Sequence, residues 1–121
     1  MKAIELRIGN SIIYNGGLPE DVDEITIVEI ADIVWLQQNN YEFNKYHKPI
    51  PLTEEWLLRF GFERNDNYKI KEFVRGDMII YTYNKVNKEV YYGICVEVKI
   101  KYIHQLQNLY FALTGRELKT D

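Results

Sequence analysis

Two segments of this chain carry start and stop signals for short helices, and the other structural expectations are built around them. In the first, Thr53 fits the N-cap, because its side-chain oxygen can accept a hydrogen bond from a backbone amide of the first turn. Gly61 fits the position just past the end, where a left-handed conformation costs glycine least. In the second, apolar residues recur along one helix face and Gly115 fits the stop. We expect helices at about residues 53–60 and 102–114.

The chain before the first helix has the pattern of strands. Residues 11–14 and 24–30 are rich in β-branched side chains, which favour strands. Residues 33–37 fit a third strand, and a helix over about 28–38 fits the same short apolar run, because periodicity alone cannot separate the two. The polar and aromatic residues 38–48 predict a loop.

The chain after the first helix has the pattern of an antiparallel meander with one wet face. We expect strands over residues 68–73, 78–83, 89–96 and 97–101, with a turn at 84–88. Together these patterns predict an α+β fold in a single domain, residues 1–121. Its curved antiparallel sheet, either open or barrel-like, would be packed by the two short helices.

The charge is modest and uneven. A net charge of −3 argues against broad binding to phosphate backbones. Residues 1–66 hold 12 acidic and 6 basic side chains, a net of −6, whereas residues 67–121 hold 6 acidic and 9 basic, a net of +3. Two solvated faces explain this difference, and a mildly basic patch is the sharper alternative. Its members would be Lys69, Lys71, Arg75, Lys85, Lys88, Lys99 and Lys101.

Cellular location is predicted from what the chain lacks. Cys95 is the only cysteine, so no intramolecular disulfide can form, and its apolar neighbours predict a small buried side chain. The charged first residues do not have the pattern of a secretory signal. No apolar run approaches the roughly 18 residues of a membrane span. We therefore expect a cytoplasmic protein that does not enter a membrane.

No motif for catalysis or for metal binding is recognisable. Glu54 and Glu55 are adjacent on a helix and point about 100° apart, so they suit the positive helix N-terminus better than an acid/base pair. His47 and His104 lack neighbours at metal-ligand spacing, so each is expected to be solvated or hydrogen-bonded. Gly16-Gly17 lacks the spacing of a phosphate-binding loop. The sequence predicts no catalytic residue, no metal and no cofactor, and an enzyme is the less favoured alternative.

Tyrosine is over-represented, with ten residues in 121. Tyr81 and Tyr83 fall on the same face of one expected strand, and Tyr91 falls on a neighbouring strand. Tyrosine combines apolar area with a polar tip and can stack on bases, so it suits recognition surfaces. Ordinary strand propensity is the alternative explanation. We take these three tyrosines as candidate ligand- or partner-binding residues.

The polar side of the last helix is uncharged. It carries His104, Gln105, Gln107 and Asn108, where exposed helices usually carry Glu and Lys. A neutral face of this kind suits partial burial, either inside the domain or against a partner. His104, Gln105 and Asn108 are therefore further candidate binding residues, and packing inside the domain is the alternative.

Three segments together are similar to a family of small uncharacterised bacteriophage and prophage proteins. They are Glu5 to Asn10 (ELRIGN), Pro49 to Phe62 (PIPLTEEWLLRFGF) and His104 to Gly115 (HQLQNLYFALTG). The resemblance covers about a third of the chain directly, and this family has no assigned catalytic residues. It implies an accessory protein that acts in the cytoplasm of a bacterial host.

We expect a non-enzymatic protein that binds a host protein or a small nucleotide signal, in host takeover or anti-defence. This expectation rests on the tyrosines, the missing catalytic motif and the phage resemblance. The alternative is nucleic-acid binding through the basic, tyrosine-rich C-terminal half. A homodimer is compatible with the sequence.

Overall fold

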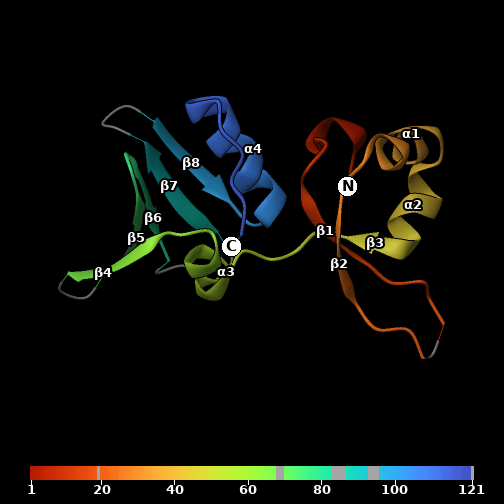
Figure 1. Ribbon diagram of the computed structural model, residues 1–121, viewed down its shortest axis with the longest axis horizontal. Helices are drawn as coiled ribbons and strands as arrows, with labels where there is room; N and C mark the ends of the chain where they lie inside the picture. Colours follow the sequence, from red (N-terminus) through yellow and green to blue (C-terminus); the bar gives the residue numbers. More distant parts are fainter. Residues whose placement is uncertain (19, 68–69, 83–86, 93–95, 121) are drawn as a thin grey trace. The chain divides into compact units, whose positions relative to one another are not determined.

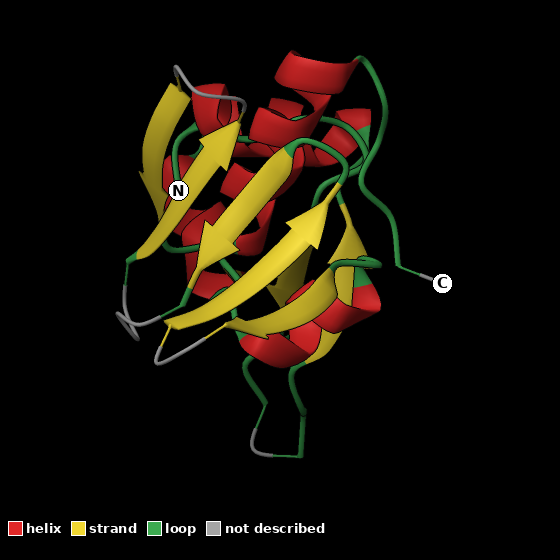
Figure 2. Ribbon diagram, turned by 90° about the vertical axis from the view of Figure 1, so that its left-hand side faces the viewer, coloured by secondary structure: helices red, strands yellow, loops and turns green. Residues whose placement is uncertain are grey.

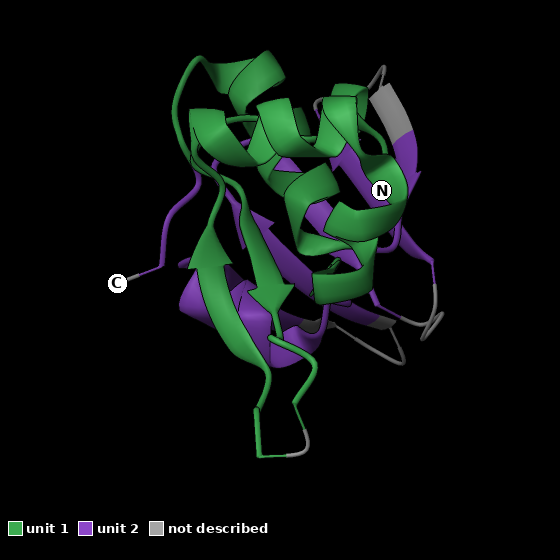
Figure 3. Cartoon of the chain, turned by 90° about the vertical axis from the view of Figure 1, so that its right-hand side faces the viewer, with its two compact units in different colours: residues 1–50, 102–117 green, residues 51–101, 118–121 purple. Residues whose placement is uncertain are grey.

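The computed structural model describes residues 1–18, 20–67, 70–82, 87–92 and 96–120 (Figure 1). Contacts between Cα atoms divide the chain into two compact units, which have different colours in Figure 3. Unit 1 contains residues 1–50 and 102–117, and unit 2 contains residues 51–101 and 118–121. The expectation of a single domain stays a prediction.

Unit 1 combines a small antiparallel sheet with helices. Strand β1 (Ser11–Tyr14) lies in the middle of the sheet, between β2 (Glu24–Ile27) and β3 (His47–Lys48). The helical elements of unit 1 are η1 (Ala3–Glu5), α1 (Ile30–Gln38), α2 (Asn40–Tyr46) and α4 (Ile103–Thr114).

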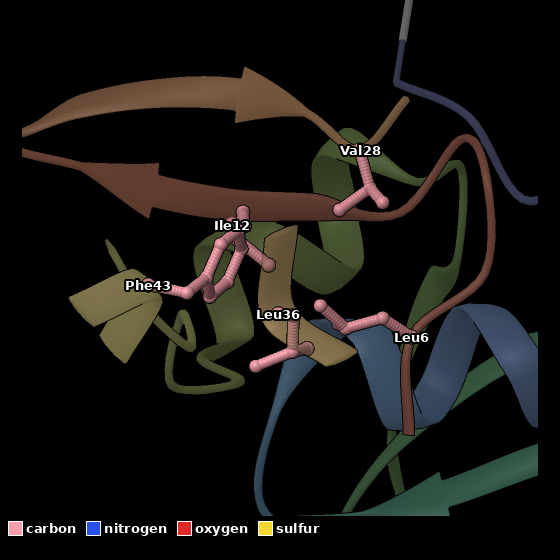
Figure 4. Packing of buried hydrophobic residues seen from close by; sticks show 5 residues of the cluster. All are labelled: Leu6, Ile12, Val28, Leu36 and Phe43. Atoms are coloured by element: carbon pink, nitrogen blue, oxygen red, sulfur yellow. The ribbon is translucent and has the colours of Figure 1, made fainter. Parts of the chain in front are cut away.

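The core of unit 1 is built from widely separated segments. Its buried members are Leu6, Ile12, Val28, Leu36 and Phe43. Figure 4 shows these side chains converging from β1, from the residues flanking β1 and β2, and from the two consecutive helices. Each is at most 6% exposed, so burial of these side chains stabilises unit 1.

Helices α1 and α2 occupy a stretch for which the sequence pattern favoured other structure. Residues 33–37 lie inside α1, so the expected third strand is wrong and the helical alternative is correct. The loop expected over residues 38–48 is also wrong, because most of it forms α2 and its end forms β3.

Local capping explains why this stretch is helical. The Asp32 carboxylate accepts a hydrogen bond from the backbone amide of Glu29 at 2.9 Å, at the start of α1. The Asn39 side chain accepts one from the amide of Glu42 at 3.1 Å, at the start of α2. These side chains satisfy backbone amides that a helix start leaves without a partner.

Unit 2 contains one short helix and a five-stranded antiparallel meander, whose strands appear side by side in Figure 2. The helix is α3 (Glu54–Arg59). The strands follow chain order: β4 (Glu63–Asn67), β5 (Ile70–Arg75), β6 (Met78–Tyr81), β7 (Lys88–Tyr92) and β8 (Val96–Ile100).

The two faces of the meander differ in composition. Side chains that pair directly across strands share a face. One such row consists of Phe73, Ile80 and Val90, all fully buried. A row on the opposite face consists of Glu72, Tyr81 and Glu89, all half-buried. Ile79 and Tyr91 pair on this second face, so the half-buried side is the one that carries tyrosines.

The predicted α+β class and both predicted helices are confirmed. The Thr53 hydroxyl accepts a hydrogen bond from the amide of Trp56 at 3.4 Å. Gly61 and Gly115 end their helices with φ of +84° and +72°. The strands, however, divide between two sheets instead of forming one, and neither sheet closes into a barrel in the described part of the chain. Strand β4 was not expected from its sequence.

Candidate functional site

The tyrosines proposed for binding share one face of the five-stranded sheet. The rings of Tyr81 and Tyr91 meet edge-on, with centroids 5.3 Å apart and an interplanar angle of 78°. Tyr83, the third candidate, lies outside the described residues, as does Cys95. We call the face formed by Glu72, Ile79, Tyr81, Glu89 and Tyr91 the tyrosine face.

The tyrosines of this face lie beside carboxylates. The hydroxyl of Tyr91 donates a hydrogen bond to the Glu89 carboxylate at 3.1 Å. Burial, and after it the neighbouring carboxylate of Glu72, raises the pKa of Tyr81. The tyrosine hydroxyls are thus placed against carboxylates, and the local charge disfavours an approaching phosphate.

The lysines and arginines proposed as a basic patch are divided between the two faces of this sheet. Lys71 lies 3.8 Å from the Glu54 carboxylate, and Arg75 donates to the backbone carbonyl at the C-cap of α3. Lys88 is only 4% exposed, and burial lowers its pKa although Glu54 opposes the shift. Lys99 lies directly opposite Glu89 in the register of β7 and β8, so it belongs to the same face of the sheet as the tyrosines. The described basic residues therefore do not form one continuous surface.

The amide side chains of α4 bind the segment that leads into β1. Gln107 is 3% exposed, and its Oε1 accepts a hydrogen bond from the backbone amide of Ser11 at 2.9 Å. Asn108 accepts from the side-chain amide of Asn10 at 2.9 Å and donates to the carbonyl of Glu5 at 2.8 Å. Gln105 acts within its own helix, where it accepts from the amide of the N-cap residue at 3.0 Å.

Arg7 adds further interactions between the segment that leads into β1 and helix α4. Its guanidinium donates to the Asn108 side chain at 3.3 Å and forms a 2.5 Å ion pair with Glu117. It also lies over the Phe111 ring, 4.1 Å from the centroid. Two of the three segments that resemble phage proteins therefore contact each other within unit 1. This packing gives Gln105 and Asn108 structural roles, and their binding roles stay predictions.

His104 does not have the expected environment. The ring is 1% exposed, and neither nitrogen has a hydrogen-bond partner in the described part of the chain, so the expected solvated or hydrogen-bonded state is wrong. Nε2 lies 3.9 Å from the Glu5 carboxylate, and the ring stacks on Tyr102 at 5.8 Å between centroids. Burial lowers the pKa of His104, while Glu5 opposes the shift. The imidazole is therefore held in its neutral form.

An exposed apolar strand lies at one edge of the small sheet; a strand was expected here from the sequence, but its exposed position at an edge was not. In the order β2-β1-β3, β2 has a strand partner on one side only. Its Ile25 and Ile27 are 52% and 53% exposed. Leu18 and Val22, in the connection before β2, are 59% and 70% exposed. Alternation predicts a strand here, but it cannot show that the strand lies at an edge.

Carboxylates surround these apolar side chains. Glu20 and Glu24 are exposed in the same segment. The Asp23 carboxylate already has partners within the chain, since Lys48 lies 2.8 Å from it and Asn15 donates a hydrogen bond to it at 3.0 Å. The hydrogen bonds from Lys48 and Asn15 hold the pKa of Asp23 below its usual value. We call Leu18, Val22, Ile25 and Ile27, together with Glu20 and Glu24, the edge surface.

The described residues also bear on the expected classes of function. Among the described residues, no group of three or more His, Cys, Asp or Glu side chains could hold a metal ion. None of the described helices has the length and apolar character needed to cross a bilayer. No family model, curated protein or solved structure matches the chain. The resemblance to phage proteins accordingly rests on the three sequence segments alone.

Proposed function

We propose that this chain is a non-enzymatic phage or prophage protein that acts in the bacterial cytoplasm by binding a host protein through the edge surface. The observation that carries the proposal is the exposure of Ile25 and Ile27 on a strand whose outer side has no strand partner within the described residues. Unprotected apolar edges promote aggregation, so proteins usually blunt them. An edge of this kind is better explained as an interaction site.

The geometry suits the addition of a strand from the partner. An extended segment can pair with the free side of β2, where backbone hydrogen bonds supply affinity and alternate side chains supply specificity. Ile25 and Ile27 would contact apolar side chains of that segment. Glu20 and Glu24 would favour Lys or Arg beside them, which raises the association rate and disfavours acidic segments.

The test uses one edge variant and one matched control. Affinity purification from a bacterial lysate identifies the candidate partner, and calorimetry then measures the purified pair. We expect Ile25→Glu to weaken binding by about 2 kcal/mol or more, roughly thirty-fold in Kd. Tyr41→Glu places the same charge on an 83% exposed aromatic of α2 and should leave Kd unchanged. Equal affinities for the wild type and Ile25→Glu would overturn the proposal.

The tyrosine face is the second candidate surface for the same function. Its carboxylates favour a cationic protein segment over the nucleotide signal or nucleic acid that the sequence also suggested. In the same calorimetric experiment, Tyr81→Ala and Tyr91→Ala should have little effect. Loss of binding in these variants, with their unfolding midpoints unchanged, would move the site from the edge surface to the tyrosine face.

A further inference from the structure

A pocket of about 200 Å³ lies within unit 1. It is formed by the end of β1, the connection to β2, the end of α2 and strand β3. The side chains that line it include Asn15, Asp23, Lys45, Tyr46, His47 and Lys48. Its volume is below the range of about 300–1,000 Å³ that is typical of pockets for drug-sized ligands. A ligand must therefore be small.

The imidazole of His47 is fixed in one orientation at this pocket. It is 5% exposed, stacks on Phe43 with centroids 3.9 Å apart and meets the edge of Trp35 at 5.4 Å. Its Nδ1 lies 2.9 Å from the carbonyl oxygen of Phe43. Since a carbonyl can only accept, Nδ1 carries a proton, which leaves Nε2 as the acceptor when the ring has a single proton. No described residue forms a hydrogen bond with Nε2.

The charged side chains that line the pocket have a net positive charge. Lys48 and Asn15 both bind the Asp23 carboxylate, so this acid is already neutralised. Lys45 has no carboxylate partner in the described part of the chain, and its Nζ lies 5.6 Å from the centroid of the Tyr46 ring. A lysine without a carboxylate partner among the described residues, an imidazole held by its neighbours and an aromatic ring thus line the same small space.

We propose that this pocket binds a small anion that also carries an O–H or N–H donor. In this proposal Lys45 attracts the negative charge, Nε2 of His47 accepts a hydrogen bond from the ligand's O–H or N–H, and Tyr46 packs against the body of the ligand. A buried polar group built to receive a hydrogen bond discriminates strongly against analogues that lack the donor. The proposal does not rest on partner binding through the edge surface, although Gly17 and Asp23 of the pocket belong to the same connection between β1 and β2.

Pairs of probes that differ in the donor test the proposal. Lactate and propionate differ in one hydroxyl, and phosphate and sulfate differ in the protons that phosphate retains near neutral pH. In NMR titrations of the full chain, lactate or phosphate should shift the amide signals of Gly17, Tyr46 and His47 saturably. The matching probe without the donor should bind at least ten-fold more weakly. Whether lactate or phosphate binds distinguishes a carboxylate site from a phosphate site.

Two variants complete the test. Lys45→Gln removes an exposed cation and should weaken binding of the preferred probe at least five-fold, whereas Lys2→Gln, the matched control, should not. No saturable shift with either lactate or phosphate at tens of millimolar would overturn the proposal. Equal binding of both members of a pair would also overturn it, because the His47 acceptor would then have no role.

Discussion

At the scale of single residues, the polar side chains of α4 divide into satisfied and unsatisfied groups. Gln107 and Asn108 meet the backbone and side-chain groups of residues 5–11, so their burial is compensated by hydrogen bonds. His104 is buried beside them without such compensation. Leaving a buried polar group without a partner costs roughly 1–3 kcal/mol, so His104 is a local weakness of unit 1.

His104 should make stability depend on pH. Its pKa is lowered in the folded state from the ordinary value of 6.5, so the unfolded chain binds its proton more readily. The stability of the folded state that depends on a neutral His104 is fully present above pH 6.5, and it is lost as the pH falls from there toward the folded-state pKa. Urea unfolding of the wild type at pH 7.5 and 5.5 should show lower stability at 5.5.

One variant separates the effect of His104 on the pH dependence of stability from the effects of the carboxylates and of His47. His104→Leu keeps the site apolar and removes the titration, so its loss of stability between pH 7.5 and 5.5 should be smaller than that of the wild type. At pH 7.5 it should be at least as stable, because an unpartnered imidazole is replaced by an apolar group. An identical pH dependence in the two proteins would show that the pKa of His104 is the same in the folded and the unfolded state, which would contradict this prediction.

At the scale of elements, structure was predictable where a strong local signal exists. The caps at Thr53, Gly61 and Gly115 are local, and the helices that they bound were found from sequence. Strand β4 has the sequence ERNDN, whose residues are depleted in strands, and pairing with β5 overrides that preference. The exposure of β2 was also not predictable from its residues. It arises because β2 lies at the edge of the sheet in the order β2-β1-β3, and strand order is not encoded in the sequence of β2 itself.

The same reasoning predicts how much a local cap contributes to α2. Asn39→Ala removes the side chain that accepts from the amide of Glu42, and it should destabilise the protein by about 1 kcal/mol. Gln37→Ala changes an exposed residue of α1 nearby and should stay within about 0.5 kcal/mol of the wild type. Chemical denaturation measures both. Equal effects would mean that packing alone, and not the cap, determines this helix.

At the scale of the whole molecule, charge and apolar exposure favour a protein partner over nucleic acid. The net charge is −3, the described lysines and arginines of the proposed basic patch lie on both faces of the five-stranded sheet, and the tyrosine face carries carboxylates. The candidate binding residues chosen from sequence were polar or aromatic. The edge surface was missed because its isoleucines are ordinary strand residues until their exposure is known.

We predict weak or absent nucleic-acid binding from this distribution of charge. Fluorescence anisotropy with a labelled single-stranded oligonucleotide at about 50 mM salt should show no saturable binding at micromolar protein, since few lysines can neutralise phosphates together. Binding that is tight at low salt and falls steeply as salt rises would restore the nucleic-acid alternative.

Amide hydrogen exchange of the protein, free and bound to its captured partner, tests the edge-surface proposal most directly. In the free protein, amides on the outer side of β2 should exchange quickly, because no described strand pairs with them. In the complex, we predict slowed exchange within residues 24–27 and little change in β6 and β7. Unchanged exchange in β2, with protection confined to β6 and β7, would contradict binding through the edge surface.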